Sequence, residues 1–163
     1  KRDFKMGFST WSYGPTLEAV NASYEFVTTN GDVYSEHMDN KVPWESWING
    51  AELPLEFTNL VQDKINRKPA NNELLLSVSF LNGDRSDIME DFDGVKPTYN
   101  SLGDSVLIEA YLKHVSYLVD KLNPKYLVYS IESNELFVNN PTLWTGFRSL
   151  MESVGERLKI KYH

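Results

Sequence analysis

The sequence predicts an α/β fold made of parallel βαβ units, and three observations lead to this prediction. Four short apolar runs each precede a longer segment in which apolar residues recur at helical spacing. The third run, residues 74–81, is almost continuously apolar, as in strands buried on both faces of a parallel sheet. Parallel neighbouring strands need crossover connections, and helices supply them here. The order is therefore βαβαβαβα.

The first unit consists of a strand over residues 4–8 and a helix over residues 17–28. Thr16 has a hydroxyl suited to the N-cap of that helix. The pair Asn30-Gly31 follows the last apolar position, and glycine is favoured just past a helix end.

The second unit begins with a strand over residues 32–36 and continues with a long polar and aromatic loop over residues 37–52. A helix over residues 55–67 follows, with Pro69 just beyond its end. This loop is the first long connection of the chain.

The third unit pairs the apolar strand with a helix that Ser101 is expected to open, with Asp104 placed as in a capping box. The helix ends before Asn123-Pro124. Between strand and helix lies a connection over residues 82–100, whose acid-rich part is expected to be a solvated loop.

The fourth unit has a strand over residues 126–131, a short loop to Asn140, and a final helix that Pro141 begins. Two architectures fit this order. One is a small open doubly wound sheet, complete at 163 residues. The other is the first four strand-helix units of a (β/α)8 barrel, which needs about 250 residues. A fifth strand is expected where the chain stops, so residues 1–163 are predicted to be an incomplete N-terminal half barrel.

Composition excludes several classes of protein. Hydrophobic residues make up 41% and aromatics 13% of the chain, too much for intrinsic disorder. There is no cysteine, which excludes disulfides, thiolate metal sites and cysteine nucleophiles. A net charge of -7 argues against nucleic acid as a partner. No apolar run of about 18 residues exists to span a membrane. The absence of cysteine and a first residue other than methionine, Lys1, give a modest preference for a secreted or periplasmic location.

Polar and aromatic residues gather where the strands end. Ligands meet the carboxyl ends of parallel strands in both architectures. Three of the four tryptophans follow the first two strands, and flat indole faces beside carboxylates and amides suit a sugar. The candidates are Ser9–Tyr13 after the first strand, Glu36, His37, Asp39, Trp44 and Trp47 after the second, Asn82, Asp84 and Arg85 after the third, and Glu132, Asn134 and Glu135 after the fourth.

Motifs for other chemistries are missing from the sequence. It contains no G-x-G-x-x-G after the first strand, no G-x-x-x-x-G-K-[ST] and no G-x-S-x-G. No cofactor is predicted. No metal site is predicted either, because Glu36, His37 and Asp39 on one segment have no fourth ligand nearby in the sequence.

The pair Asn134-Glu135 is the strongest candidate for chemistry. A glutamate at the end of a strand can protonate a glycosidic oxygen, and an adjacent asparagine can donate to the sugar 2-hydroxyl. A second copy, Asn72-Glu73, stands at the entry of the third strand and is expected to be a polar strand start. Strand alternation is expected to point Glu132 away from Glu135, where it faces the helices or pairs with a buried polar group.

Two segments carry a resemblance to clan A retaining glycoside hydrolases, which are (β/α)8 barrels. They are residues 129–137, YSIESNELF, and residues 31–39, GDVYSEHMD, followed by Val42-Pro43-Trp44. The second segment is similar to extracellular barrel proteins related to endo-β-1,4-galactanases. The resemblance implies that Glu135 is the acid/base and Asn134 its partner, while the nucleophile, a second glutamate at the end of strand seven, lies outside this chain.

This resemblance predicts a glycoside hydrolase acting on a β-linked saccharide. From their positions after the strands, Trp11, His37, Trp44 and Asn82 are expected to bind the substrate. The 163 residues alone are expected to be inactive, and a second chain or copy is expected to complete the barrel. The alternatives are a non-catalytic carbohydrate-binding barrel and an open doubly wound signalling or flavin domain.

Overall fold

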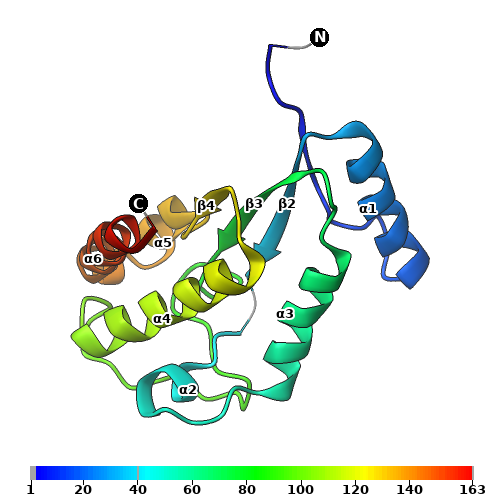
Figure 1. The fold of residues 1–163 in the computed structure, drawn as a ribbon. Coiled ribbons are helices and arrows are strands. Elements are labelled where there is room, and N and C mark those ends of the chain that lie inside the picture. The colour runs from blue at the N-terminus through cyan, green and yellow to red at the C-terminus, as the bar shows by residue number, and fades with distance from the viewer. Residues whose placement is uncertain (1–2, 40, 163) are drawn as a thin grey trace.

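The computed structural model describes residues 3–39 and 41–162, and its centre is one four-stranded parallel sheet. The strands lie in the order of the sequence, β1-β2-β3-β4, with no reversal of direction or order. Figure 1 shows the sheet and the helices around it. The strands are β1 (Gly7–Ser9), β2 (Val33–Met38), β3 (Glu73–Val78) and β4 (Tyr126–Val128).

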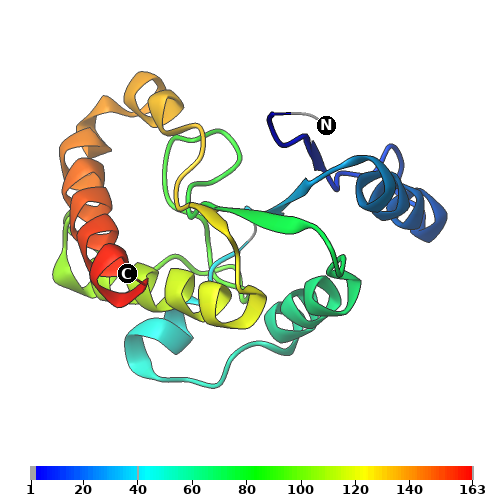
Figure 2. The ribbon, with the colours of Figure 1, turned by 45° about the horizontal axis from the view of Figure 1, so that its top comes forward.

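The helices form an arc along one side of this sheet, as Figures 1 and 2 show from two directions. No helix in the described part of the chain is long and apolar enough to cross a membrane. The helices are α1 (Leu17–Asn30), α2 (Trp44–Asn49), α3 (Leu55–Arg67), α4 (Ser105–Leu122), α5 (Ser133–Asn139) and α6 (Trp144–Tyr162), with a 3-10 turn η1 (Pro141–Leu143) before α6.

The two faces of the sheet differ in burial. Along β2, Tyr34, Glu36 and Met38 are buried, whereas the residues between them are half-buried. Since successive strand residues point to opposite faces, one face packs against the helices and the other is open. A hollow of about 310 Å³ lies on the open face, lined by residues that include Ser9, Val33, Ser35, His37, Leu75 and Ser77.

The core lies between the sheet and the helices, with α4 at its centre. Eight of the 18 residues of α4 are buried. Tyr111 of this helix packs against Phe80, with ring centroids 4.5 Å apart, and its hydroxyl donates to the Tyr129 carbonyl at 2.6 Å. The helix layer buries Leu74, Leu76 and Val78 of the third strand, whereas Leu75 on the opposite face is half-buried and lines the hollow, so the expected burial on both faces is met only in part.

The prediction of four strand-helix units is confirmed, but several boundaries and two elements were wrong. β1 begins three residues and ends one residue later than predicted, β2 begins one residue and ends two residues later, and β4 ends at Val128 rather than at residue 131. The predicted loop 37–52 contains α2, and the predicted loop after β4 contains α5. Both helices are short, at 6 and 7 residues, and bury few side chains, so they leave almost no periodic signal.

The expected start of the third long helix at Ser101 was also wrong. α4 begins at Ser105, and Asp104 is its N-cap residue. The Asp104 carboxylate turns back and accepts hydrogen bonds from the Asn100 and Ser101 amides, at 2.8 and 3.2 Å. Asp104 thus stabilises the turn before the helix rather than forming a capping box.

The acid-rich part of the connection, residues 84–94, is largely packed against the rest of the chain instead of being the solvated loop that was expected. Ile88 is fully buried and forms an antiparallel bridge with Leu81, and Asp91 is 5% exposed. The Asp91 carboxylate accepts a hydrogen bond from the Glu45 amide at 2.7 Å, at the start of α2. The acid-rich loop therefore folds back against the sheet end and helps to hold α2.

Candidate functional site

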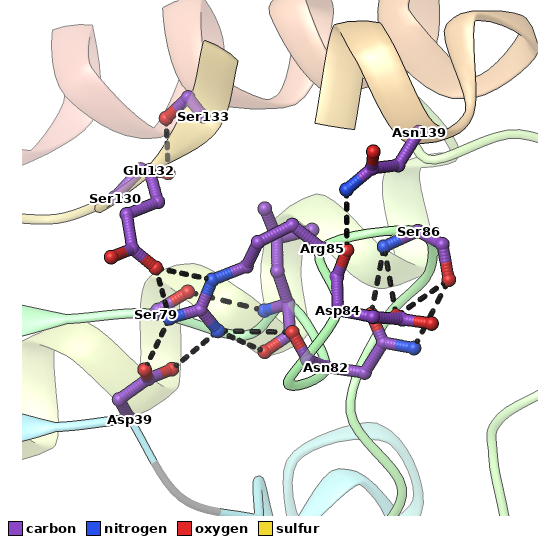
Figure 3. A network of polar contacts seen from close by, with 11 residues as sticks. Asp39, Ser79, Asn82, Asp84, Arg85, Ser86, Ser130, Glu132, Ser133 and Asn139 are labelled. Atoms are coloured by element: carbon purple, nitrogen blue, oxygen red, sulfur yellow. Dashed lines mark hydrogen bonds and ion pairs between the residues drawn. The ribbon is translucent and has the colours of Figure 1, made fainter. Parts of the chain in front are cut away.

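Arg85 connects the carboxyl ends of three strands. Its guanidinium donates to the Asp39 carboxylate after β2, at 2.5 and 3.1 Å, and to the Glu132 carboxylate after β4, at 2.9 Å. It also donates to the Leu81 and Asn82 carbonyls at the end of β3. Figure 3 shows these contacts converging on one side chain, which is only 5% exposed.

The backbone on both sides of this ion pair is in an unusual conformation. Arg85 has φ 54° and Glu132 has φ 50°, in the left-handed region that costs a residue with a side chain about 1–2 kcal/mol. Such strain persists only where surrounding contacts outweigh it. Here the charge-assisted hydrogen bonds of Arg85 hold both turns, and Glu132 pairs with this buried side chain, which was one of the two environments expected for it.

The Asn82 side chain, which was predicted to bind substrate, forms hydrogen bonds within its own loop. Its side-chain oxygen accepts hydrogen bonds from the Ser86 and Asp87 amides, both at 3.0 Å. Asp84 accepts from the Ser86 hydroxyl at 2.6 Å, and this hydrogen bond lowers the pKa of Asp84 below its ordinary 3.8. These contacts give the Arg85 turn its shape.

α5 presents the pair Asn134-Glu135 at this end of the sheet. At its N-cap, Glu132 is bonded to Arg85. At its other end, Asn139 donates to the Asp84 carbonyl at 2.6 Å and Asn140 donates to the Ser86 carbonyl at 2.9 Å. The loop after β3 thus fixes α5 at both ends.

The side chains of Asn134 and Glu135 are exposed, and neither makes a hydrogen bond or ion pair with another residue that the structure describes. Glu135 therefore differs from its neighbours Asp39 and Glu132, which are both ion-paired with Arg85. Asn72-Glu73, the other copy of the dipeptide, is a strand start as predicted, with Glu73 bonded to Lys5 at 2.6 Å.

Trp11 and His37 form the second polar-aromatic group, at the β1 end of the sheet. Their rings are stacked, with centroids 5.5 Å apart and planes inclined by 30°. Trp11 is 80% exposed. His37 is half-buried, and its imidazole makes no hydrogen bond with any residue in the described ranges. One indole face and the imidazole nitrogens are available to a ligand.

Trp44 does not present a face to a ligand. It is 1% exposed, its indole N–H donates to the Met89 carbonyl at 2.8 Å, and its ring packs edge-on against Phe80. Its prediction as a sugar-stacking residue conflicts with this burial, because stacking needs an open ring face. Trp47 is likewise engaged, donating to His114 at 3.2 Å.

Glu36 lies on the helix-covered face, away from His37 on the open face. Its buried carboxylate accepts from the Tyr24 hydroxyl and pairs with Lys64 at 2.5 Å. Burial and this carboxylate raise the pKa of Tyr24. No cluster of three potential metal ligands occurs among residues 3–39 and 41–162.

The structure brings together only part of the predicted site. Trp11 and His37 belong to β1 and β2, whereas Asn134 and Glu135 follow β4, at the other edge of the sheet. Neighbouring strands lie about 4.8 Å apart, so β1 and β4 are roughly 14 Å apart along the sheet. A ligand that touches both groups must be longer than one sugar ring.

The sequence analysis placed Arg85 at the strand ends but gave it no role. The available signal was a lone arginine within an acid-rich stretch, between Asp84 and Asp87. Its partners Asp39 and Glu132 lie more than 40 residues away in the sequence, so spacing alone could not reveal them.

Comparison of the chain with family models, with curated proteins and with solved structures found no match.

Proposed function

We propose that this chain is half of a (β/α)8 barrel that binds a β-linked oligosaccharide at the carboxyl ends of its strands. Two features of the sheet support the half barrel. The strand order is sequential, whereas a doubly wound sheet contains a point where the order reverses. One face of the sheet packs against helices while the other is open, as the inner face of a barrel segment is before closure.

The observation that carries the function is the free carboxylate of Glu135 on a helix fixed at both ends. In a retaining glycosidase one carboxylic acid protonates the leaving oxygen and then deprotonates water, while a second carboxylate about 5–5.5 Å away attacks the sugar. We assign the first role to Glu135 and the contact with the 2-hydroxyl to Asn134. The second carboxylate would come from a polypeptide segment other than the 163 residues.

Trp11 and His37 extend the proposed site toward β1. The exposed indole face of Trp11 suits the C–H face of a pyranose, and the His37 ring nitrogens suit its hydroxyls. Their distance from Glu135 favours an oligosaccharide that lies across the sheet end.

A non-catalytic carbohydrate-binding protein is the second candidate, and one observation favours it. Among the carboxylates described at the strand ends, Asp39 and Glu132 are both ion-paired with Arg85 and neither is free to act as a nucleophile. This candidate keeps the same ligand and the same binding residues.

Binding is tested first. Titration of the chain with β-1,4-linked galacto-, gluco- and manno-oligosaccharides should give a saturable change in tryptophan fluorescence. Trp11→Ala should weaken binding by up to about tenfold, since an aromatic contact contributes roughly 0.5–1.5 kcal/mol. Leu55→Ala, at an equally exposed site on α3, should leave it unchanged. No saturable signal, or equal loss in both variants, would contradict the proposal.

Hydrolysis separates the two candidates. In any preparation that releases sugar from an aryl β-glycoside, Glu135→Gln should lower kcat by about 10²–10⁴-fold. NMR should show a product with the anomeric configuration of the substrate. Glu152→Gln, at an exposed position on α6, is the control. Binding without hydrolysis under all conditions would select the non-catalytic candidate.

A further inference from the structure

Hydroxyl side chains and one imidazole lie together on the open face of the sheet, near the carboxyl ends of β1, β2 and β3. The strand register places Ser9 beside Ser35, and His37 beside Ser77. Neighbouring strands lie about 4.8 Å apart, and residues in register point to the same face. All four side chains therefore line one space, the hollow of about 310 Å³ described above.

Ser77 is a buried polar residue whose side chain has no partner in the protein. It is 4% exposed, and its hydroxyl makes no hydrogen bond with any residue of 3–39 or 41–162. Among these residues, Asn72 Oδ1 is the one side-chain atom that is both fully enclosed and unpartnered, so the Ser77 oxygen reaches the hollow. Nearly all buried polar groups have a hydrogen-bond partner, because leaving one unpaired is costly. The partner of Ser77 therefore has to come from whatever occupies the hollow.

The other groups in the hollow define the chemistry of its occupant. The Ser35 hydroxyl and the His37 imidazole also lack partners in the part of the chain that the structure describes, and the Ser9 hydroxyl only accepts from the Trp11 amide, at 3.2 Å. Hydroxyls donate and accept, as does a neutral imidazole. The residues described as lining the hollow include no carboxylate, ammonium or guanidinium group, while Val33 and Leu75 add apolar surface. This lining matches an uncharged molecule with several hydroxyls on a carbon framework.

The hollow also lies between the two groups of the proposed site. Trp11 stacks on His37 at the β1 and β2 side, and Glu135 follows β4, so the two groups are separated by roughly three strand spacings of about 4.8 Å. Ser77, on β3, is one spacing from β4. A volume of about 310 Å³ is at the lower end of the range for ligand pockets, roughly 300–1,000 Å³, and suits a single sugar ring.

We infer that this hollow is a central subsite, in which Ser77 and Ser35 form hydrogen bonds with the hydroxyls of one uncharged sugar ring. His37 borders both this subsite and the Trp11 ring, so the ring of the next sugar unit lies on Trp11. The inference rests on the saccharide ligand proposed above, and not on hydrolysis. It makes the two serines specificity-determining residues, because a ring without a hydroxyl opposite Ser77 leaves that buried group unpaired.

NMR of the imidazole signals tests the subsite with single sugar rings. At least one of galactose, glucose and mannose should give a saturable shift of the His37 signals, which His37→Gln identifies. Ser77→Ala and Ser35→Ala should each weaken this binding by about two- to tenfold, as expected for one hydrogen bond between neutral groups. Ser116→Ala, at a buried serine on α4, should leave it unchanged. Trp11→Ala should weaken oligosaccharide binding more than binding of a single ring.

Urea unfolding separates a ligand contact from a structural role. Because the Ser77 hydroxyl has no partner in the described chain, Ser77→Ala should leave the unfolding midpoint unchanged or raise it. A lower midpoint, no sugar-dependent shift of His37, or equal affinity of the wild type and Ser77→Ala would overturn the inference. Oligosaccharide binding that needs Trp11 but neither serine would overturn it and leave the proposed function standing. Single-ring binding that needs Ser77, without binding of longer saccharides, would support it and count against the proposed function alone.

Discussion

Replacement of Arg85 by methionine should lower the free energy of unfolding by about 3 kcal/mol. Removing one partner of a buried ion pair typically costs about 3–5 kcal/mol. The lower value applies because the Asp39 and Glu132 side chains are 25% and 56% exposed and water can resolvate them. The Leu81 and Asn82 carbonyls lose a donor as well.

Urea unfolding at a fixed protein concentration measures this cost, with the midpoint expected to fall at constant slope. Arg148→Met is the matched control, because Arg148 forms an exposed ion pair with Glu152 worth less than about 0.5 kcal/mol. A double-mutant cycle should give a larger coupling of Arg85 with Asp39 than with the more exposed Glu132. A loss for Arg85→Met no greater than that for Arg148→Met would refute the reasoning.

Three further predictions concern stability. Burial lowers the pKa of His114 from 6.5 to about 3, so the unfolded chain takes up a proton below pH 6.5 that the folded chain does not. Urea unfolding between pH 7 and 5 should therefore show stability falling by up to about 1.4 kcal/mol per pH unit, and His114→Phe should reduce this slope. Gly146→Ala should cost about 1–3 kcal/mol, because its Cβ would lie 2.5 Å from Ser101 Oγ and 3.0 Å from two amide nitrogens. Gly83→Ala, with no atom within 4 Å, should change the same unfolding midpoint little. Thr16→Ala should cost about 1 kcal/mol in that assay, since the Thr16 hydroxyl accepts from the Ala19 amide at 3.1 Å; an unchanged midpoint would exclude a capping role.

Local chemistry explains which elements the sequence predicted well. Both ends of α3 agree with the prediction, since a proline precedes the helix and the helix ends two residues before Pro69. Thr16 caps α1 as expected. These signals depend on residues next to one another in the chain, so a single sequence contains all the information needed.

The site depends on contacts between distant segments, and the sequence therefore predicted less of it. Trp44 was interpreted as a ligand platform because it lies in a polar segment after a strand. Its burial results from the loop after β3, which folds over it and accepts its N–H through Met89. The sequence predicted that Trp11 follows the first strand. It did not predict that the Trp11 ring stacks on His37.

The carboxylates at the strand ends divide into two groups with different uses. Asp39 and Glu132 pair with Arg85, and Asp84 accepts from Ser86, so these charges hold the loops in place. Neutralising Asp39, Glu132 or Asp84 should therefore alter the conformation of these loops, and any effect on chemistry would follow from that change. Glu135 alone combines an exposed carboxylate, a helix fixed at both ends and no partner among the described residues. A reaction at this end of the sheet that needs an unpaired carboxylate would therefore use Glu135. Such a reaction would depend on Arg85 only indirectly, because Arg85 helps to fix the position of α5.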